Sequence, residues 1–150
     1  MQQVTPILQS NQIWISGNVP SSKNSKQIVD KKKKKNLEFL KLEEDTKSKK
    51  KIISSKLVLY YKKNRKNEYL VNKVKFKNLI KDKPFPIRLQ FYFIRDSKRD
   101  FDYINIAQIV QDIMIEQNWI EDDNARFIIP NFDCGYEVNK DNPGVILTIL

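Results

Sequence analysis

Four stretches of the chain have the hydrophobic pattern of β-strands. Residues 12–16 alternate polar with β-branched or aromatic side chains and run into a turn-forming segment at 17–22. Residues 87–94 first alternate and then become fully apolar, which is typical of a strand buried in a sheet. Residues 126–129 and 145–150 predict two closing strands joined by a polar connection. The chain therefore supplies the strands of a small sheet.

Two further stretches have the spacing of helices. Apolar and aromatic residues recur between lysines and arginines over residues 56–75, with Ser54 or Ser55 as the N-cap, so a basic helix is predicted there. A second helix follows Asp102, whose carboxylate can accept hydrogen bonds from the first exposed N–H groups. Its apolar face consists of Ile104, Ala107, Val110 and Met114, widened by Ile106, Ile109 and Ile113. We expect this face to pack on the sheet.

The order of these elements predicts an α/β fold of the α+β kind, a small mixed sheet with two main helices. With 150 residues and 40% hydrophobic content, the chain can bury one modest core, so residues 1–150 are expected to form a single domain. A Lys-rich flexible insert is predicted at about 24–52, where lysine runs at 31–35 and 47–51 bracket a weakly amphipathic stretch.

Charge is distributed unevenly along the chain. Residues 23–83 carry 22 Lys and Arg against 7 Asp and Glu, whereas residues 84–150 carry 6 against 11. The basic part is suited to binding a polyanion such as nucleic acid, and the acidic part to binding a cation. A solvated, Lys-rich surface without a nucleic-acid partner is the alternative.

The absence of certain residues excludes whole classes of chemistry. The chain contains no His, which removes Ser-His and Cys-His catalysis and His-bound metals. Cys134 is the only cysteine, so a cysteine zinc cage is excluded, and we expect Cys134 to be a small buried or half-buried side chain. No stretch reaches the roughly 18 apolar residues of a membrane span, which predicts a cytoplasmic protein without a membrane partner. Carboxylates and metal-bound water remain for any hydrolytic chemistry.

Three aspartates form the strongest candidate for such chemistry. Asp100 and Asp102 follow the apolar strand at positions i and i+2, so their side chains can point to the same side. The second helix can return the chain so that a third carboxylate from the Asp122-Asp123 pair lies beside them. Oxygen ligands of this kind favour Mg²⁺ or Mn²⁺. Taken alone, an Asp-x-Asp pair is more often a helix cap or a surface acidic pair than a metal site.

These residues resemble the RusA-like Holliday junction resolvases of phages and prophages. The resemblance rests on Arg99-Asp100-Phe101-Asp102-Tyr103, on Asp112-Ile113-Met114, on Trp119-Ile120-Glu121-Asp122-Asp123 and on the opening segment Gly17-Asn18-Val19-Pro20-Ser21-Ser22-Lys23-Asn24. It covers residues 12–24 and 86–128 and hardly touches the basic insert.

The resemblance implies a homodimer that cuts four-way DNA junctions with Mg²⁺ or Mn²⁺. By the same resemblance, Asp100, Asp102 and Asp123 are the metal ligands. The family has a Lys in the intervening helix, where this chain has Gln108, or Ile106 if the helix is aligned from its other end.

Several cations are candidates for DNA contacts. Lys98 and Arg99 can hold the scissile phosphate or simply balance the neighbouring charge, and Lys23, Lys26 and Lys56 are weaker candidates for backbone contacts.

Two aromatic residues among the lysines of the first helix, Tyr60 and Tyr61, can stack on bases. Aromatic residues at helical spacing more often belong to the core. Trp119 is expected to be a packing anchor that fixes the Asp122-Asp123 turn.

Three functions are thus compatible with the sequence. The first is a metal-dependent endonuclease for branched DNA, and the second is a branched-DNA binding protein that does not cut. The third is a basic accessory protein whose aspartates form only a cap and a surface network.

Overall fold

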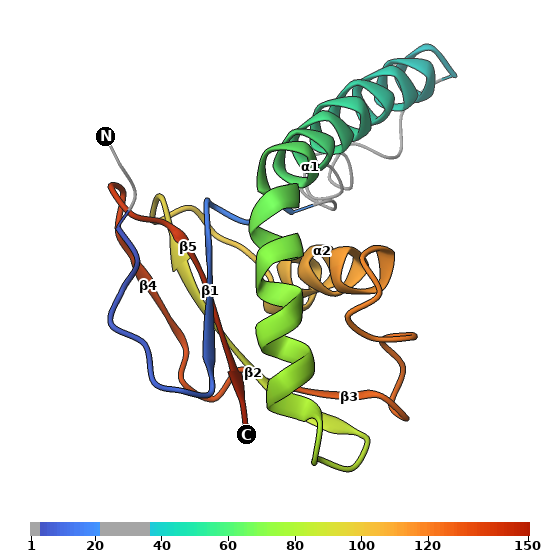
Figure 1. Cartoon of the computed structure of the whole chain (residues 1–150). Helices are drawn as coiled ribbons and strands as arrows, with labels where there is room; N and C mark the ends of the chain where they lie inside the picture. Colours follow the sequence, from blue (N-terminus) through green and yellow to red (C-terminus); the bar gives the residue numbers. More distant parts are fainter. Residues whose placement is uncertain (1–3, 22–36) are drawn as a thin grey trace.

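The computed structural model describes the backbone of residues 4–21 and 37–150 and the side chains of residues 4–21 and 56–150. The described residues form an α+β fold, a mixed sheet with two helices, as the sequence predicted, and the sheet has five strands (Figure 1). The elements in chain order are β1 (Gln12–Ser16), α1 (Leu37–Ile80), β2 (Ile87–Arg95), α2 (Tyr103–Glu116), β3 (Ile128–Asn131), β4 (Tyr136–Val138) and β5 (Gly144–Ile149).

The sheet is built around β2 and β5. Its order is β1-β5-β2-β3, and β4 pairs with the distal half of β2, beyond the part that pairs with β3. β5 runs antiparallel to both β1 and β2, whereas β3 and β4 run parallel to β2. The predicted strands all exist within a few residues of their expected bounds.

One strand was missed because its pattern carries no burial signal. β4 consists of three residues, Tyr136 to Val138, all of them exposed, within the stretch expected to be a polar connection. It forms because the edge of β2 is left open beyond β3, and only the tertiary arrangement creates that edge.

The first helix is longer than predicted. α1 begins at Leu37 and ends at Ile80, so Ser54 and Ser55 lie inside the helix and neither is its N-cap. The predicted flexible insert at 24–52 falls partly outside the described residues, and from residue 37 onward the backbone is helical. Lys, Glu and Leu all have high helix propensity, which outweighs the weak amphipathicity of this stretch.

The second helix begins and ends with well-defined caps. Asp102 is its N-cap, with its Oδ1 accepting a hydrogen bond from the Ile104 N–H at 3.2 Å, as predicted. At the C-terminal end, Asn118 has a φ of 60°, and the N–H groups of Asn118 and Trp119 donate to the carbonyls of Ile115 and Met114. This is the Schellman arrangement, in which Asn tolerates the left-handed conformation.

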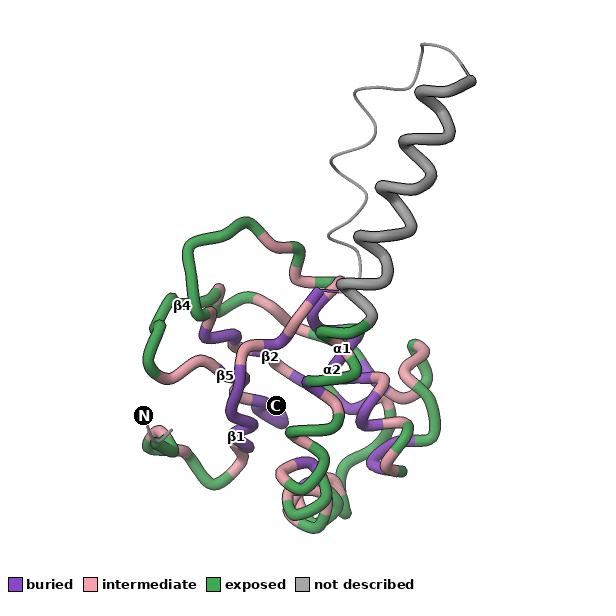
Figure 2. The backbone as a smooth tube through the Cα atoms, turned by 90° about the horizontal axis from the view of Figure 1, so that it is seen from above, coloured by how far each residue is buried: buried purple, intermediate pink, exposed green. Residues whose placement is uncertain are grey.

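Both helices lie on the same side of the sheet and cover its inner face (Figures 1 and 2). Figure 2 shows the buried positions along the central strands and on the helix faces that meet them. The largest fully buried side chains come from α1, from β2 and from the residue after α2: Tyr69, Phe76, Phe91, Phe93 and Trp119. No helix of the described segments is long and apolar enough to cross a lipid bilayer.

Trp119 is the anchor that the sequence predicted. Its ring is fully buried against Tyr69 and Phe76, with ring centroids 5.7 and 5.1 Å away. Its indole N–H donates to the Tyr69 carbonyl at 3.1 Å, so the chain leaving α2 is fixed to α1.

The expectation for Cys134 is wrong. Its thiol is exposed in the turn that precedes β4. This turn bends through Gly135, which has a φ of 72°, and it projects from the sheet, so it buries little.

Candidate functional site

Asp100 and Asp102 lie in an irregular segment and do not leave the strand directly. β2 ends at Arg95, a bend follows, and both aspartates are exposed in the extended stretch before α2. The sequence argument placed them at the strand end because the apolar run continues to Ile94 without a visible break. The four residues between the strand end and Asp100 loosen the i, i+2 geometry that a continuing strand would impose.

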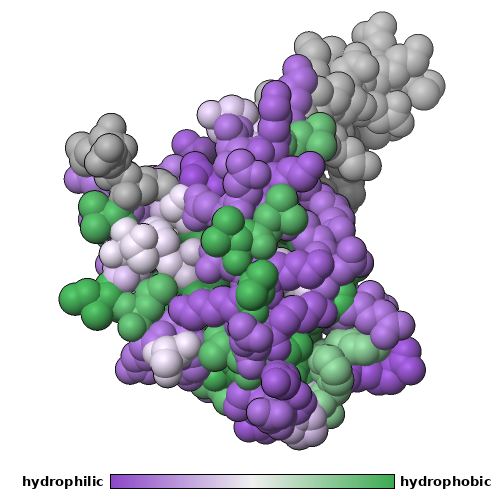
Figure 3. Space-filling view, viewed as in Figure 1, coloured by the Kyte–Doolittle hydropathy of each residue, from purple (hydrophilic) through white to green (hydrophobic). Residues whose placement is uncertain are grey.

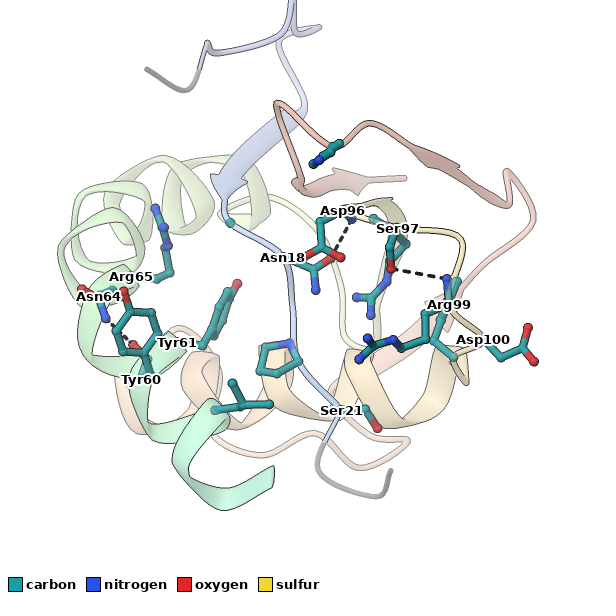
Figure 4. A pocket seen from close by; sticks show the side chains of 16 residues that line it. Asn18, Ser21, Tyr60, Tyr61, Asn64, Arg65, Asp96, Ser97, Arg99 and Asp100 are labelled. Atoms are coloured by element: carbon teal, nitrogen blue, oxygen red, sulfur yellow. Dashed lines mark hydrogen bonds between the residues drawn. The ribbon is translucent and has the colours of Figure 1, made fainter. Parts of the chain in front are cut away.

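The two aspartates differ in their immediate surroundings. Asp102 uses Oδ1 to cap α2. Among the side chains that the structure describes, none donates a hydrogen bond to the Asp100 carboxylate, which points outward from the neighbouring cavity (Figure 4). The cap reading of Asp102 is therefore established, and it leaves Oδ2 of that residue for a further ligand.

Gln108 connects the third aspartate to α2. Its Nε2 donates to Asp123 Oδ2 at 2.8 Å and to Asp112 Oδ1 at 2.7 Å. Ile106, the alternative position for the family lysine, is fully buried in the core, so Gln108 is the residue that faces the acidic turn. A neutral amide satisfies both carboxylates without neutralising either, where a lysine would do both.

Asp122, the first member of the acidic pair, holds the turn together. Its Oδ1 accepts from the Asp123 N–H at 2.8 Å and its Oδ2 from Asn124 Nδ2 at 2.9 Å. These bonds, the backbone N–H first, lower the pKa of Asp122 below its ordinary value. Asp122 therefore has a structural role, whereas Asp123 faces α2.

The donor atoms of the predicted triad suit a hard divalent cation, but the triad is not assembled. Among the side chains of residues 4–21 and 56–150, no three carboxylates or thiolates converge closely enough to hold one metal ion. The role of Asp100, Asp102 and Asp123 as metal ligands therefore stays a prediction.

A cavity of about 660 Å³ lies beside Asp100. Its walls come from three distant parts of the chain: the turn after β1, one face of α1, and the loop after β2 (Figure 4). Lys140, between β4 and β5, completes the lining. Volumes of several hundred cubic ångströms are typical of ligand pockets.

The cations of this cavity are unusual for the half of the chain to which they belong. Residues 84–150 carry only six Lys and Arg, and three of them line this cavity. These are Arg95, Arg99 and Lys140. Asp96 and Asp100 are the acidic residues of the lining, and Arg65 from α1 adds a fourth cation.

Arg95 is held in a fixed position. Its Nη1 donates to the Val19 carbonyl at 2.5 Å, and its guanidinium lies 4.8 Å from the centre of the Phe101 ring. Burial lowers the pKa of Arg95, and the neighbouring Asp96 partly offsets this effect. An arginine keeps its charge near neutral pH even so, because its ordinary pKa lies far above 7.

The other side of the cavity is held by a polar network between α1 and β1. Glu68 accepts from the Ser16 N–H at 2.7 Å and from Arg65 Nη1 at 3.0 Å, and the Ser16 hydroxyl bonds both residues. Gly17 allows this approach, since it has a φ of 97° and a Cβ there would lie 2.6 Å from Arg65 Nε. The Arg65 charge is thus neutralised internally.

The predicted nucleic-acid contacts have mixed outcomes. Arg99 lines the cavity, and Lys56 and Lys98 are exposed outside it. Lys23 and Lys26 lie outside the described residues. Sequence reasoning missed Arg95 and Lys140, because only the pairing of β2 with β4 and β5 brings these two positions together.

Tyr61 belongs to the core, whereas Tyr60 is exposed and can stack on a base, so each tyrosine has one of the two roles that the sequence allows. Tyr61 is buried and shares a hydrogen bond of 2.9 Å with Tyr69, whereas the Tyr60 side chain is 69% exposed on the cavity wall. The pattern of the sequence could not separate them, because neighbouring residues on a helix point about 100° apart.

No protein-family model matches this chain, and no match was found among curated proteins or solved structures.

Proposed function

We propose that this protein is a metal-dependent endonuclease that cuts four-way junctions or other branched DNA in phage-type recombination, repair or packaging. The observation that carries the proposal is the position of exposed aspartates beside a basic cavity. Asp100 belongs to the cavity lining with its carboxylate pointing outward, and Arg99 and Lys140 are among the cations of the same lining (Figure 4). Hydrolysis of a phosphodiester needs this combination, since cations bind the phosphate and carboxylates bind metal ions.

The proposed roles follow from position. Arg99 holds the phosphate in the cavity and Lys98 contacts the DNA outside it, while Asp100, Asp102 and Asp123 are the residues that would bind Mg²⁺ or Mn²⁺. A bound divalent ion would supply Lewis-acid activation of water, which suits a chain without His. Gln108 positions Asp123 through its amide, and the cap bond positions Asp102.

The proposal includes a RusA-like homodimer, because a symmetric branched substrate needs two cuts related by a two-fold axis. Apolar side chains on the outward side of α1 support it. Leu70, Val71 and Val74 have exposed fractions of 45, 74 and 65%. Figure 3 shows hydrophobic side chains among hydrophilic ones on the face of the molecule where α1 lies in Figure 1. A second copy of the chain would bury this row.

Substitution of Asp100 or Asp102 by Asn tests the proposal. Each variant should reduce cutting of a synthetic four-way junction in Mg²⁺ or Mn²⁺ by about 100-fold or more, while junction binding stays intact or strengthens because a repulsive charge is lost. Asn also serves as an N-cap, so Asp102→Asn keeps the start of α2. The measurements are a gel-based cleavage assay and a binding titration in EDTA.

Asp82→Asn is the matched control. Asp82 is exposed in the turn before β2, at the opposite end of that strand from Asp100, so its substitution should leave cutting unchanged. Undiminished cutting by both Asp100→Asn and Asp102→Asn would remove these residues from the mechanism.

A second candidate function is branched-DNA binding without cleavage. Gln108 favours it, because its neutral amide donates a hydrogen bond to Asp123 at the position where the resembled family has a lysine. The unassembled triad points the same way. Junction binding by the wild-type protein with no cutting in either metal ion would select this function over the first.

A further inference from the structure

The cavity beside Asp100 has two unlike walls. One wall, from the end of β2, the loop after it and Lys140, carries three cations against two carboxylates, so its net charge is positive. The other wall, from α1, presents Leu57, Tyr60 and Asn64. These three residues follow one another at spacings of three and four, so they share one face of the helix.

The cations of the first wall are available to bind an anion. Arg95 is anchored by the Val19 carbonyl, which fixes a positive charge in the floor of the cavity. Of the side chains described, none forms an ion pair with Arg99 or Lys140. The Arg99 side chain reaches back toward the cavity whereas Asp100 points away (Figure 4). This wall is therefore suited to one anionic group, such as a phosphate.

The helix wall has an aromatic surface that the fold does not use. Tyr60 is 69% exposed and Leu57 is 51% exposed, although both line the cavity. Asn64 donates its Nδ2 to the Tyr60 carbonyl at 2.7 Å, which fixes the amide and leaves Oδ1 free to accept. Such a wall is suited to a flat ring that carries an amino group.

We propose that this cavity holds one unpaired nucleotide, with its phosphate on Arg99 and Lys140 and its base stacked on Tyr60. A ligand with an anionic group at one end and a flat ring at the other matches both walls at once, and proteins that bind single strands combine the same two features. This inference deepens the proposed function, since it names the part of a branched DNA that this protein selects: a nucleotide unpaired at the branch point.

Affinity for a fluorescein-labelled single-stranded oligonucleotide, measured by anisotropy in EDTA, tests the inference without any cutting. Tyr60→Ala should weaken binding about ten-fold, because stacking of a base on an aromatic ring contributes to that order, and Tyr60→Phe should retain it. Leu59→Ala is the matched control on the same helix. Leu59 is 64% exposed but does not line the cavity, so its loss should change affinity less than two-fold.

The phosphate contact is tested by two neighbouring cations. Arg99→Ala and Lys98→Ala remove the same charge from adjacent exposed positions, but only Arg99 lines the cavity. We expect Arg99→Ala to weaken binding several-fold more than Lys98→Ala. Equal losses would overturn the inference, because they would show that only the overall charge matters.

Photo-crosslinking gives a direct readout of the stacked base. An oligonucleotide carrying one 5-iodouracil should form its adduct at Tyr60, identified by mass spectrometry of the peptides. An adduct only at other aromatic residues, or less than a two-fold effect of Tyr60→Ala, would overturn the inference. Junction cutting measured on the same variants separates the two proposals. Tyr60-dependent binding without any cutting sinks the nuclease alone, and cutting without Tyr60-dependent binding sinks the nucleotide cavity alone.

Discussion

Replacing Trp119 by Phe should lower the free energy of unfolding by about 3 kcal/mol. The indole N–H donates to the Tyr69 carbonyl at 3.1 Å inside the core, and such a bond contributes about 1 kcal/mol net. The smaller ring also removes three buried ring atoms, two of them carbons besides the nitrogen, and at about 0.8 kcal/mol per methylene-sized group the two carbons contribute about 2 kcal/mol. In a domain of this size the loss corresponds to a decrease in Tm of about 6 to 12 °C.

Trp14→Phe is the matched control for this experiment. Trp14 is 7% exposed on β1, and its indole N–H has no hydrogen-bond acceptor among the described residues. The same chemical change at Trp14 should therefore cost about 1 kcal/mol less than at Trp119. Urea unfolding followed by far-UV circular dichroism measures both variants, since the signal does not depend on either indole.

Two outcomes would refute this reasoning. A cost below about 1 kcal/mol for Trp119→Phe would show that the ring is not a packing anchor. Equal costs for the two variants would show that the bond to the Tyr69 carbonyl contributes nothing. A changed slope of the unfolding free energy against urea would instead point to an altered unfolded state, so the slope is compared as well.

Two further predictions concern the backbone at the cavity and the outer face of α1. Gly17→Ala should destabilise the fold by about 2 kcal/mol, because Gly17 has a φ of 97° and the added Cβ meets Arg65. Gly135→Ala should cost about 1 kcal/mol, because Gly135 has a φ of 72° but its added Cβ would make only an ordinary contact, 3.9 Å from the Tyr103 hydroxyl. Thermal unfolding checks both, and a Gly17 cost no larger than that of Gly135 contradicts the clash. The wild-type protein should have twice its chain mass of 17.8 kDa by light scattering, and Val71→Asp should return it to the monomer. A monomeric wild type at micromolar concentration contradicts the homodimer.

Much of the fold follows from local patterns that the sequence carries openly. The alternation at residues 12–16 and the apolar run from Ile87 predicted two strands to within a residue, because burial of one or both faces leaves a period that can be read directly. The Asp102 cap was equally predictable, since capping depends on one side chain and the N–H groups beside it. Such features need no knowledge of the remaining chain.

Predictions failed mainly where the deciding contact lies far away in the sequence. The position of β4 was missed, since the open sheet edge with which it pairs exists only in the tertiary structure. The length of α1 was missed for a local reason, because high helix propensity outweighed a weak hydrophobic pattern. Arg95 and Lys140 gave no signal as partners, because 45 positions and two strand pairings separate them. Tyr60 and Tyr61 are indistinguishable by type and differ only in which side of α1 they occupy.

By itself, then, the sequence determined the fold class, the separation of a basic from an acidic half, and the absence of any His-based chemistry. Composition and short-range periodicity carry that information, and no long-range contact is needed to read it. Only the tertiary structure decided that Gln108 contacts Asp123 and that the Asp122 carboxylate forms its hydrogen bonds within its own turn. It also decided that three cations of the acidic half line one cavity. These facts depend on how the two helices pack on the sheet, and packing brings together residues whose separation in the chain hides their relation.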